Sequence, residues 1–435
     1  LGILRNDDDM PAFDEYNQGS YSMHLGVEPL DKEYDIDVGL RFHVNRDDYE
    51  PMDLKEKIRD LLKNHTEYGT KIKKPCVTVT YKKDGEAAYH VDLVTYVYED
   101  KDDSDSQLYL ARGKNRDSEE TCWEKSDPVG LVEYVNDKYK GDDNKEDREQ
   151  FRRVVRYIKR WKNKKFSSSG NAEPPSIAIT LIAVDHFEAS KKYDYIEEKY
   201  CYDDLQAVIS FAKEIQNLFV FKEVNENGRL MYTIEYNLSS LLNFESDVNL
   251  FRKMSDNYMT DFKEKIDDFL SSIISLTLIV GMFFSVLILS VCVFIRINTN
   301  IGIVILCLAQ SLFTAIIEDY SMYLMMKYRY KLRTLILILI VFIMKNNLYL
   351  GKIVPTALIT VIIALFIIIG VYRNGGVRLN KEYCKYALAI SLPLILHSIS
   401  LNILSQSDRI MITSYAGAAQ TGIYSLIYNF SMIAS

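Results

Sequence analysis

Two stretches within the first 100 residues have the residue pattern of β-strands. Residues 75–81 and 87–97 are rich in β-branched and aromatic side chains, and the polar residues Lys82-Lys83-Asp84-Gly85 join them. An Asp-Gly pair between two such runs is a strong signal for a tight hairpin turn. The pattern therefore predicts two adjacent antiparallel strands.

Three later stretches have apolar residues at helical spacing. They occupy residues 149–162, 205–219 and 251–269. Apolar positions that recur three and four residues apart form one face of a helix. The three stretches therefore predict amphipathic helices, and together with the strands they favour a soluble α+β domain.

From residue 273 onward the chain is strongly apolar. Residues 273–295 carry no charge before Arg296, and about 20 apolar residues are enough to cross a bilayer. Further apolar runs lie at 301–317, 332–344, 353–372, 387–404 and 410–433. We expect five membrane crossings and a sixth that the end of the sequence interrupts.

The distribution of charged residues divides the chain into the same two parts. Residues 271–435 contain 12 Lys and Arg against 4 Asp and Glu, which leaves 40 basic and 56 acidic residues for 1–270. The mean hydropathy of -0.10 is thus the average of two very different segments and excludes a single soluble domain. We expect an α+β domain over 1–269, with its sheet in about 1–140 and a helical lobe in about 141–269, followed by an all-α multi-pass membrane domain over 273–435.

Loop charges indicate how the membrane domain is oriented. If the first crossing runs outward from the cytosol, the inner loops contain eight basic residues, Lys327, Arg329, Lys331, Arg333, Arg373, Arg378, Lys381 and Lys385. The outer loops contain four, Arg296, Lys345, Lys352 and Arg409. This excess agrees with the positive-inside rule. The first residues also lack the pattern of a secretory signal, so we expect the α+β domain in the cytoplasm.

Three aspartates are placed on predicted strands so that they can meet. Asp35 and Asp37 alternate with Ile36 and Val38, and alternate residues of a strand share a face. Asp92 lies in the middle of a second strand and converges on the same cleft if the two strands are neighbours. Oxygen ligands of this kind suit Mg²⁺ or Mn²⁺. Three carboxylates can hold two such ions, which is the arrangement used in nucleotidyl transfer.

Gly19 and Ser20 precede these strands and fit the same chemistry. A glycine lets the backbone approach a phosphate closely, and the serine hydroxyl and backbone N–H can bond its oxygens. Each feature also has a simpler interpretation. Asp35 and Asp37 can be solvated carboxylates at a sheet edge, and Gly19-Ser20 can be an ordinary tight turn.

The order of these motifs resembles a known family. Gly19-Ser20, then Asp35-x-Asp37, then the isolated Asp92 resembles DNA polymerase β-type nucleotidyltransferases. Within that group, QGSY at 18–21 and EYDIDVG at 33–39 are similar to the bacterial cGAS/DncV-like nucleotidyltransferases, or CD-NTases, which make cyclic oligonucleotide signals during phage infection. The resemblance covers about 18–269 and implies a polymerase β-like palm followed by a helical lobe.

The resemblance also implies roles for further residues. Lys159-x-Trp161 and Pro174-Pro175-Ser176 are similar to motifs of the helical lobe, where the lysine and serine hold the donor triphosphate. Asp35, Asp37 and Asp92 would bind two Mg²⁺ or Mn²⁺ ions, and Asp92 would assist deprotonation of the attacking hydroxyl. Two alternatives stay open, since Lys159 lies on a basic helix face that can simply be solvated and Ser176 can be a helix N-cap. His24 departs from the family, where a small residue or Thr is common.

The membrane part has a separate resemblance. Ser391-Leu392-Pro393, the segment 406–412 and the segment 417–425 resemble polysaccharide (O-antigen) flippases of the Wzx type, which move lipid-linked sugars across the bacterial inner membrane. Residues 273–435 correspond to part of such a transporter. A chimeric or misassembled gene is therefore one interpretation of the chain.

Together these patterns predict a metal-dependent enzyme of the bacterial inner membrane, with its α+β domain in the cytoplasm and its bilayer contact through 273–435. It would convert ATP and other nucleoside triphosphates into a cyclic di- or trinucleotide used in antiphage signalling, and it would release pyrophosphate. An activator protein is a further expected partner, whereas sequence-specific nucleic acid is not. The alternatives are linear tailing of RNA, modification of a protein hydroxyl, or membrane polysaccharide transport with an inactive enzyme half.

Overall fold

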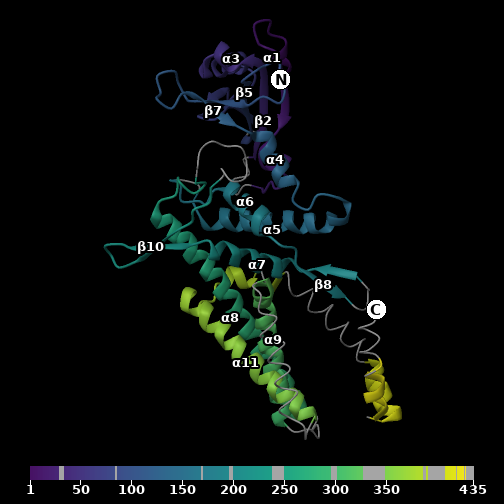
Figure 1. The fold of residues 1–435 in the computed structure, drawn as a ribbon. Coiled ribbons are helices and arrows are strands. Elements are labelled where there is room, and N and C mark those ends of the chain that lie inside the picture. Colours follow the sequence, from purple (N-terminus) through teal and green to yellow (C-terminus); the bar gives the residue numbers. More distant parts are fainter. Residues whose placement is uncertain are drawn as a thin grey trace. The chain divides into compact units, whose positions relative to one another are not determined.

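The chain folds into two compact units (Figure 1). The first unit consists of Leu1–Ala189 and Ser210–Ile266, and the second of Ser190–Ile209 and Asp267–Ser435. The computed structural model describes residues 1–28, 34–83, 86–167, 170–194, 199–237, 249–294, 301–326, 348–385, 388–389, 407–417, 419–425 and 427. The division into a palm and a helical lobe stays a prediction.

A seven-stranded mixed sheet forms the centre of the first unit, in the order β1-β2-β5-β4-β3, with β6 paired to β5 and β7 paired to β6. Strands β2 and β5 are parallel, and the other neighbours are antiparallel. The strands are β1 (Phe13–Asn17), β2 (Tyr34–Asn45), β3 (Thr70–Ile72), β4 (Val77–Lys83), β5 (Glu86–Tyr98), β6 (Leu108–Arg112) and β7 (Cys122–Ser126).

The remaining elements of the first unit are mostly helical. They are α1 (Gly2–Arg5), α2 (Gly19–Ser22), the 3-10 turns η1 (Arg46–Asp48) and η2 (Asp142–Asn144), α3 (Pro51–Leu62), α4 (Pro128–Asn136), α5 (Lys145–Lys165), α6 (Ser176–His186), and the hairpin strands β10 (Val220–Val224) and β11 (Leu230–Thr233). Helix α7 (Asp204–Asn217) belongs to both units, as does α8 (Asp256–Phe294).

Alternation along the strands gives the sheet one apolar face. Leu40 and Phe42 of β2 are fully buried on this face. Helix α3 covers it with Leu54 and Ile58, which lie four residues apart on one side of the helix and are also fully buried. Burial of each such side chain contributes about 1.5–3 kcal/mol. The opposite face of the sheet carries Asp37 and Asp92 beside a smaller buried cluster of Cys76, Val94 and Tyr96.

The structure confirms the predicted elements of the first unit. β4 and β5 pair as an antiparallel hairpin, whose turn residues 84 and 85 lie outside the described residues. Helices α5 and α7 correspond to the predicted amphipathic helices at 149–162 and 205–219. The α+β class is confirmed by the mixed sheet with its covering helices.

The predicted helix at 251–269 needs a correction. The helix begins only at Asp256, and it continues without a break through the first predicted crossing to Phe294. Leu270, Ser271 and Ser272 join the two stretches, and neither Gly nor Pro, the residues that most strongly end a helix, lies among them. One helix of 39 residues therefore replaces the two that the sequence predicts.

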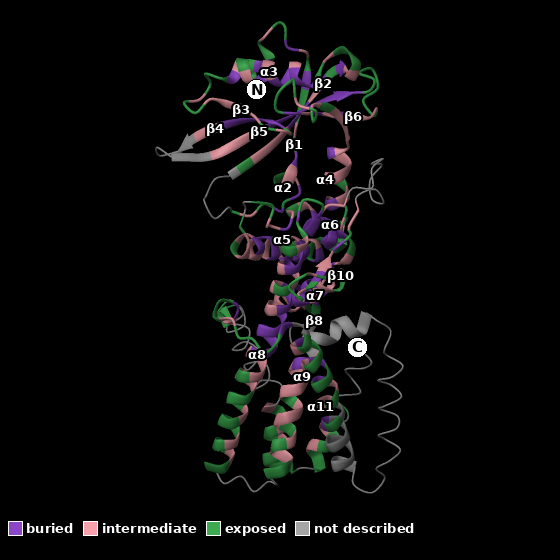
Figure 2. Ribbon diagram, turned by 90° about the vertical axis from the view of Figure 1, so that its left-hand side faces the viewer, coloured by how far each residue is buried: buried purple, intermediate pink, exposed green. Residues whose placement is uncertain are grey.

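The second unit is built around three long apolar helices, α8, α9 (Ile301–Met326) and α11 (Leu348–Gly375), and also contains the hairpin strands β8 (Lys191–Asp194) and β9 (Lys199–Tyr202). Ile274 of α8, Ile316 of α9 and Ile367 of α11 share one buried cluster. Figure 2 shows that much of the rest of these helices is exposed, although it is apolar. Phe283, for example, is 65% exposed. Large exposed apolar surfaces mark interaction with a partner or a membrane.

Among the described residues, α8 is the one helix both long and apolar enough to cross a membrane. Shorter apolar stretches lie in α9 (Ile301–Ile317) and α11 (Thr360–Arg373). The expected crossing at 332–344 lies outside the described residues, as does the run 387–404 apart from residues 388 and 389. The full set of crossings stays a prediction.

A buried lysine fixes the turn between β3 and β4. Lys55 is fully buried on α3, and its ammonium group donates hydrogen bonds to the carbonyl oxygens of Lys73 (2.8 Å), Lys74 (3.0 Å) and Gly113 (2.6 Å). Burial lowers the pKa of Lys55 to about 8, so the group remains mostly protonated at neutral pH. This cation satisfies three carbonyl groups that the sheet does not pair.

Replacement of Lys55 by Met should destabilise the first unit by about 3 kcal/mol or more, because three carbonyl groups lose a charged donor. Trp123 and Trp161 are the two tryptophans of the chain, and both lie in this unit. Their fluorescence during denaturation of the full chain in detergent therefore reports on it alone. The control is Lys63→Met, which changes an exposed lysine; equal unfolding midpoints for the two variants would contradict the assigned role.

Candidate active site

Gly19 lies directly against the carboxylate of Asp37. Its φ angle is +69°, and a Cβ atom placed on it would lie 2.2 Å from Oδ2 of Asp37. The N–H of Gln18 donates to the carbonyl oxygen of Asp37 (3.1 Å). Only glycine combines this left-handed conformation with such a close approach. The Gly19-Ser20 turn, the first part of α2, is therefore built onto the aspartate.

The sheet brings Asp37 and Asp92 side by side. Strands β2 and β5 are parallel neighbours, and Asp37 is the register partner of Asp92. The predicted adjacency of the two strands is thereby confirmed. Asp35 lies two residues before Asp37 on the same face of β2, and it is exposed, whereas Asp37 and Asp92 are partly buried.

The position of Asp37 beside Asp92 and Asp35 affects its pKa. Burial, followed by the negative charges of Asp92 and Asp35, raises the pKa of Asp37 to about 6, while Lys73 acts in the opposite direction. A carboxylate with a raised pKa is held at a free-energy cost that a nearby cation would relieve. Such a perturbed group on a polar sheet face is typical of a functional site.

Two residues that the sequence analysis missed hold Asp92. Thr78 donates from Oγ1 to Oδ1 of Asp92 (2.5 Å), and the Lys73 ammonium lies 3.5 Å from Oδ2. Thr78 is the register partner of Asp92 on β4. The hairpin signal pointed to this strand pair, but the register depends on an irregularity between Tyr81 and Lys82, for which the sequence carries no signal.

Helix α5 attaches to the loop that follows the Gly19-Ser20 turn. The Lys159 ammonium donates to the carbonyl oxygen of Leu25 (3.5 Å), whose own N–H donates to the carbonyl oxygen of Ser20 (2.9 Å). Arg156 donates to the carbonyl oxygen of His24 (2.9 Å). His24 has a φ of +56°, a conformation that His adopts more readily than most non-glycine residues. Lys159 is thus linked to the Gly19-Ser20 turn through one residue.

Lys159 is buried, so the open interpretation that it is a solvated surface lysine is wrong. Burial, followed by the charge of Lys162, lowers its pKa to about 8.

Ser176 is positioned by Lys162, which the sequence analysis did not single out. Ser176 is the first residue of α6, and Pro175 is the cap, so the N-cap alternative is wrong. Its hydroxyl accepts a hydrogen bond from the Lys162 ammonium (2.8 Å), which also pairs with Glu173. Lys162 is 4% exposed. Lys162 and Glu173 are absent from the sequence-based set, although Lys162 lies one helical turn after Lys159.

The candidate metal ligands are the three aspartates. Within the described residues, no group of three or more His, Cys, Asp or Glu side chains is already gathered closely enough to hold a metal ion. The donor chemistry nevertheless suits a hard divalent cation, because Asp37 and Asp92 are adjacent carboxylates and the pKa of Asp37 is raised by burial and then by its acidic neighbours.

Two family models match the chain. Residues 13–96 match the nucleotidyltransferase domain of cyclic GMP-AMP synthases of the DncV-like type. Residues 251–435 match the polysaccharide biosynthesis proteins. The chain joins a DncV-like nucleotidyltransferase domain to a polysaccharide biosynthesis protein domain. The first match contains Gly19, Ser20 and all three aspartates, and the second, together with apolar α8, associates residues 251–435 with a membrane.

Individual proteins are similar to the nucleotidyltransferase part. A cyclic GMP-AMP synthase of Escherichia albertii is 26% identical over 221 residues, which are 49% of this chain and 44% of that protein. The chain thus matches less than half of the length of this curated relative.

Two solved structures are also similar. The DncV cyclic AMP-GMP synthase of Vibrio cholerae is 17% identical, with a TM-score of 0.42 over 61% of this chain and 64% of that one. The CD-NTase CdnG of Bradyrhizobium diazoefficiens, solved in complex with GTP, is 12% identical, with a TM-score of 0.39 over 58% of this chain and 77% of that one.

Replacement of Gly19 by Ala should displace the Asp37 carboxylate and strain the backbone. The left-handed conformation alone costs a residue with a Cβ about 1–2 kcal/mol. We expect Gly19→Ala to lower the unfolding free energy by at least that amount, measured by tryptophan fluorescence. Gly26→Ala is the matched control in the same loop, because a Cβ at Gly26 meets nothing within 4 Å. Equal stability of the two variants would rule out the close approach.

Proposed function

We propose that the nucleotidyltransferase domain joins nucleoside triphosphates into a cyclic di- or trinucleotide and releases pyrophosphate. One observation carries the proposal: Asp37 and Asp92 are register partners on adjacent parallel strands, and Gly19 lies against Asp37. The match of residues 13–96 to DncV-like nucleotidyltransferase domains supports the reaction class. The name of the E. albertii relative, cyclic GMP-AMP synthase, supports a cyclic product.

The proposed reaction forms one phosphodiester bond per transfer. The ribose hydroxyl oxygen of one nucleotide attacks the α-phosphorus of another, and the bond from that phosphorus to the β-phosphate breaks, so pyrophosphate leaves. A second transfer closes the ring of a dinucleotide and a third closes that of a trinucleotide, and each transfer releases one pyrophosphate. The hydroxyl proton passes to Asp92, whose Oδ1 is oriented by Thr78. The Lys73 ammonium is about half exposed and lies 3.5 Å from the other oxygen, Oδ2. It can therefore move away and leave Oδ2 free to accept the proton.

Asp35, Asp37 and Asp92 would hold two Mg²⁺ or Mn²⁺ ions. When bound, such ions neutralise charge on the triphosphate and lower the pKa of the attacking hydroxyl. The protein itself positions the groups. Gly19-Ser20 offers backbone N–H groups beside Asp37, and Lys159 and Ser176 are the expected contacts for the donor triphosphate of ATP or another nucleoside triphosphate. Positioning and charge neutralisation would supply most of the rate.

The proposal also includes the cellular location and the biological role of the enzyme. Residues 273–435 would anchor it to the lipid bilayer of a bacterial inner membrane, with the enzyme domain in the cytoplasm, as the excess of basic residues in the inner loops favours. The product would act as an antiphage signal, and an activator protein would control its synthesis; both rest on the likeness to CD-NTases. RNA tailing is less favoured, because residues 1–270 carry 56 acidic against 40 basic residues.

The double variant Asp35→Asn with Asp37→Asn should lose at least about 100-fold of the pyrophosphate release, because two of the three carboxylates that would hold the charge-neutralising divalent cations are gone. The full chain in detergent is incubated with labelled nucleotides and Mg²⁺. Asp102→Asn with Asp105→Asn makes the same charge change in an exposed loop and should leave the rate unchanged. Undiminished release by the first variant would reject the assignment.

The wild-type product should resist phosphatase, and a product that phosphatase degrades would indicate linear transfer instead.

We expect substrate binding to depend on pH, because the Lys159 ammonium group loses its proton at moderately alkaline pH. Its pKa of about 8 means that the ammonium charge is present below pH 8 and is lost as the pH rises through 8. The KM for the nucleotide should therefore increase several-fold between about pH 7 and pH 9. Lys159→Arg should flatten this dependence, because guanidinium stays charged throughout. A wild-type KM that does not change over this range would remove Lys159 from the triphosphate site.

A further inference from the structure

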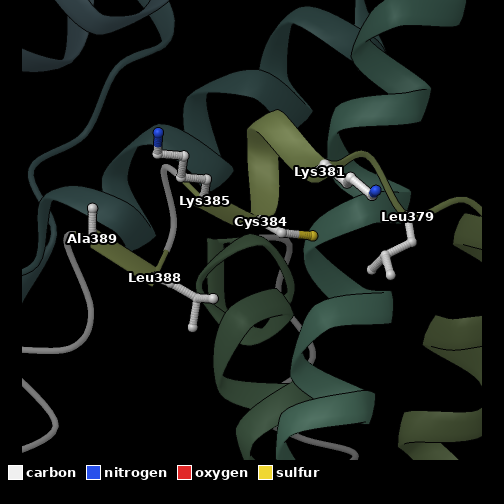
Figure 3. Close-up of a pocket in the computed structure, with 6 residues that line it drawn as sticks. All are labelled: Leu379, Lys381, Cys384, Lys385, Leu388 and Ala389. Carbon is white, nitrogen blue, oxygen red and sulfur yellow. The ribbon is translucent and has the colours of Figure 1, made fainter.

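An open groove lies just after the end of α11 in the second unit. It has a volume of about 460 Å³ and is lined by Leu379, Lys381, Cys384, Lys385, Leu388 and Ala389. Figure 3 shows Cys384 between Leu379 and Leu388. The groove thus combines apolar side chains with two ammonium groups, which lie four residues apart on one helical turn.

The groove is held in place by contacts within its own unit. The N–H of Asn380 donates to the Ser272 hydroxyl (3.2 Å), and the Ser271 hydroxyl donates to the carbonyl oxygen of Gly376. The rings of Phe269 and Tyr383 pack edge to face at 5.4 Å. These contacts tie the segment after α11 to α8, so the groove is preformed on rigid elements.

Charge in this segment is strongly one-sided. Residues 373–389 contain four basic residues, Arg373, Arg378, Lys381 and Lys385, against the single acidic residue Glu382. Arg378 already lies near Asp268 (3.8 Å). Lys381 and Lys385 are exposed, and neither ammonium group has a hydrogen-bonded or ion-paired partner in the part of the chain that the structure describes. They are available to an anion.

Apolar side chains next to these lysines are exposed as well. Val377 is 77% exposed and Leu379 is 52% exposed. Both directly follow α11, whose apolar stretch Thr360–Arg373 lies within the residues that match a membrane-associated family. A soluble anion would leave these side chains in water, whereas a lipid would cover them with its acyl chains while its phosphate meets the lysines.

We infer that this groove binds an anionic phospholipid of the surrounding leaflet, with Lys381 and Lys385 as the cations available to its headgroup phosphate and the acyl chains along Leu379 and Leu388. The site belongs to the second unit and does not depend on the proposed enzymatic reaction. A groove of this size is within the range of ordinary ligand sites. The combination of two lysine ammonium groups with apolar lining side chains favours an anionic phospholipid as the ligand.

Cys384 lies in the groove and provides a direct measurement. The full chain is placed in nanodiscs of phosphatidylcholine alone or with phosphatidylglycerol, and its cysteines are labelled with neutral N-ethylmaleimide and quantified by peptide mass spectrometry. We expect phosphatidylglycerol to slow labelling of Cys384 several-fold and to leave labelling of the exposed Cys122 unchanged. Equal rates of Cys384 labelling in the two membranes would overturn the inference. So would protection by inorganic phosphate in phosphatidylcholine nanodiscs, because the site would then accept a soluble anion.

Variants separate lipid binding from a general effect of a charged membrane. Lys381→Gln with Lys385→Gln should remove most of the protection, so that Cys384 is labelled at nearly equal rates in the two membranes, since each basic residue near an anionic surface contributes appreciably to binding. Lys381→Arg with Lys385→Arg should keep it. Lys101→Gln with Lys114→Gln removes two exposed lysines of the first unit and should have no effect. Protection that survives the first double variant would overturn the inference, and the comparison of lipids in the wild type stands even if a variant fails to fold.

Discussion

The parallel pairing of β2 with β5 is the constraint on which the candidate site depends. It places two aspartates from distant parts of the sequence in the same register, partly removed from water. Burial and then the repulsion between the neighbouring carboxylates raise the pKa of Asp37, so the pair is held at a cost in free energy. The fold holds the pair in place because the opposite face of the same strands is packed into the apolar core. The core therefore supplies the free energy that keeps two acidic groups together.

Buried lysines hold the irregular segments around this sheet. Lys55 fixes the turn that carries Lys73, Lys159 binds the loop after the Gly19-Ser20 turn, and Lys162 binds the start of α6. Lys55 and Lys159 donate to backbone carbonyl oxygens outside the strands and helices, and Lys162 donates to the Ser176 hydroxyl and pairs with Glu173. A lysine is suited to this task because its three donors can serve carbonyl groups from different segments. Lys159 is also the expected triphosphate contact, and Lys162 holds the other expected contact, Ser176, so these two lysines link the stability of the domain to substrate binding.

Several features were predictable because they depend on local patterns. Alternation in β2 showed that Asp35 and Asp37 share a face, and helical spacing located α5 and α7. The boundary of α8 was not predictable in this way. No residue between its polar and apolar halves stops a helix, so the change in composition at residue 270 marks a change of environment rather than the end of an element.

The sequence by itself determined the types of the elements, the contrast between the acidic part and the apolar part, and the residues able to carry the chemistry. Only the tertiary structure decided which of those residues meet. The irregularity between Tyr81 and Lys82 shifts the β4–β5 register by one residue, and this shift makes Thr78 the partner of Asp92. Because side chains alternate along a strand, one residue of slip exchanges the two faces. Such pairings arise from packing between distant segments, which local residue patterns do not encode.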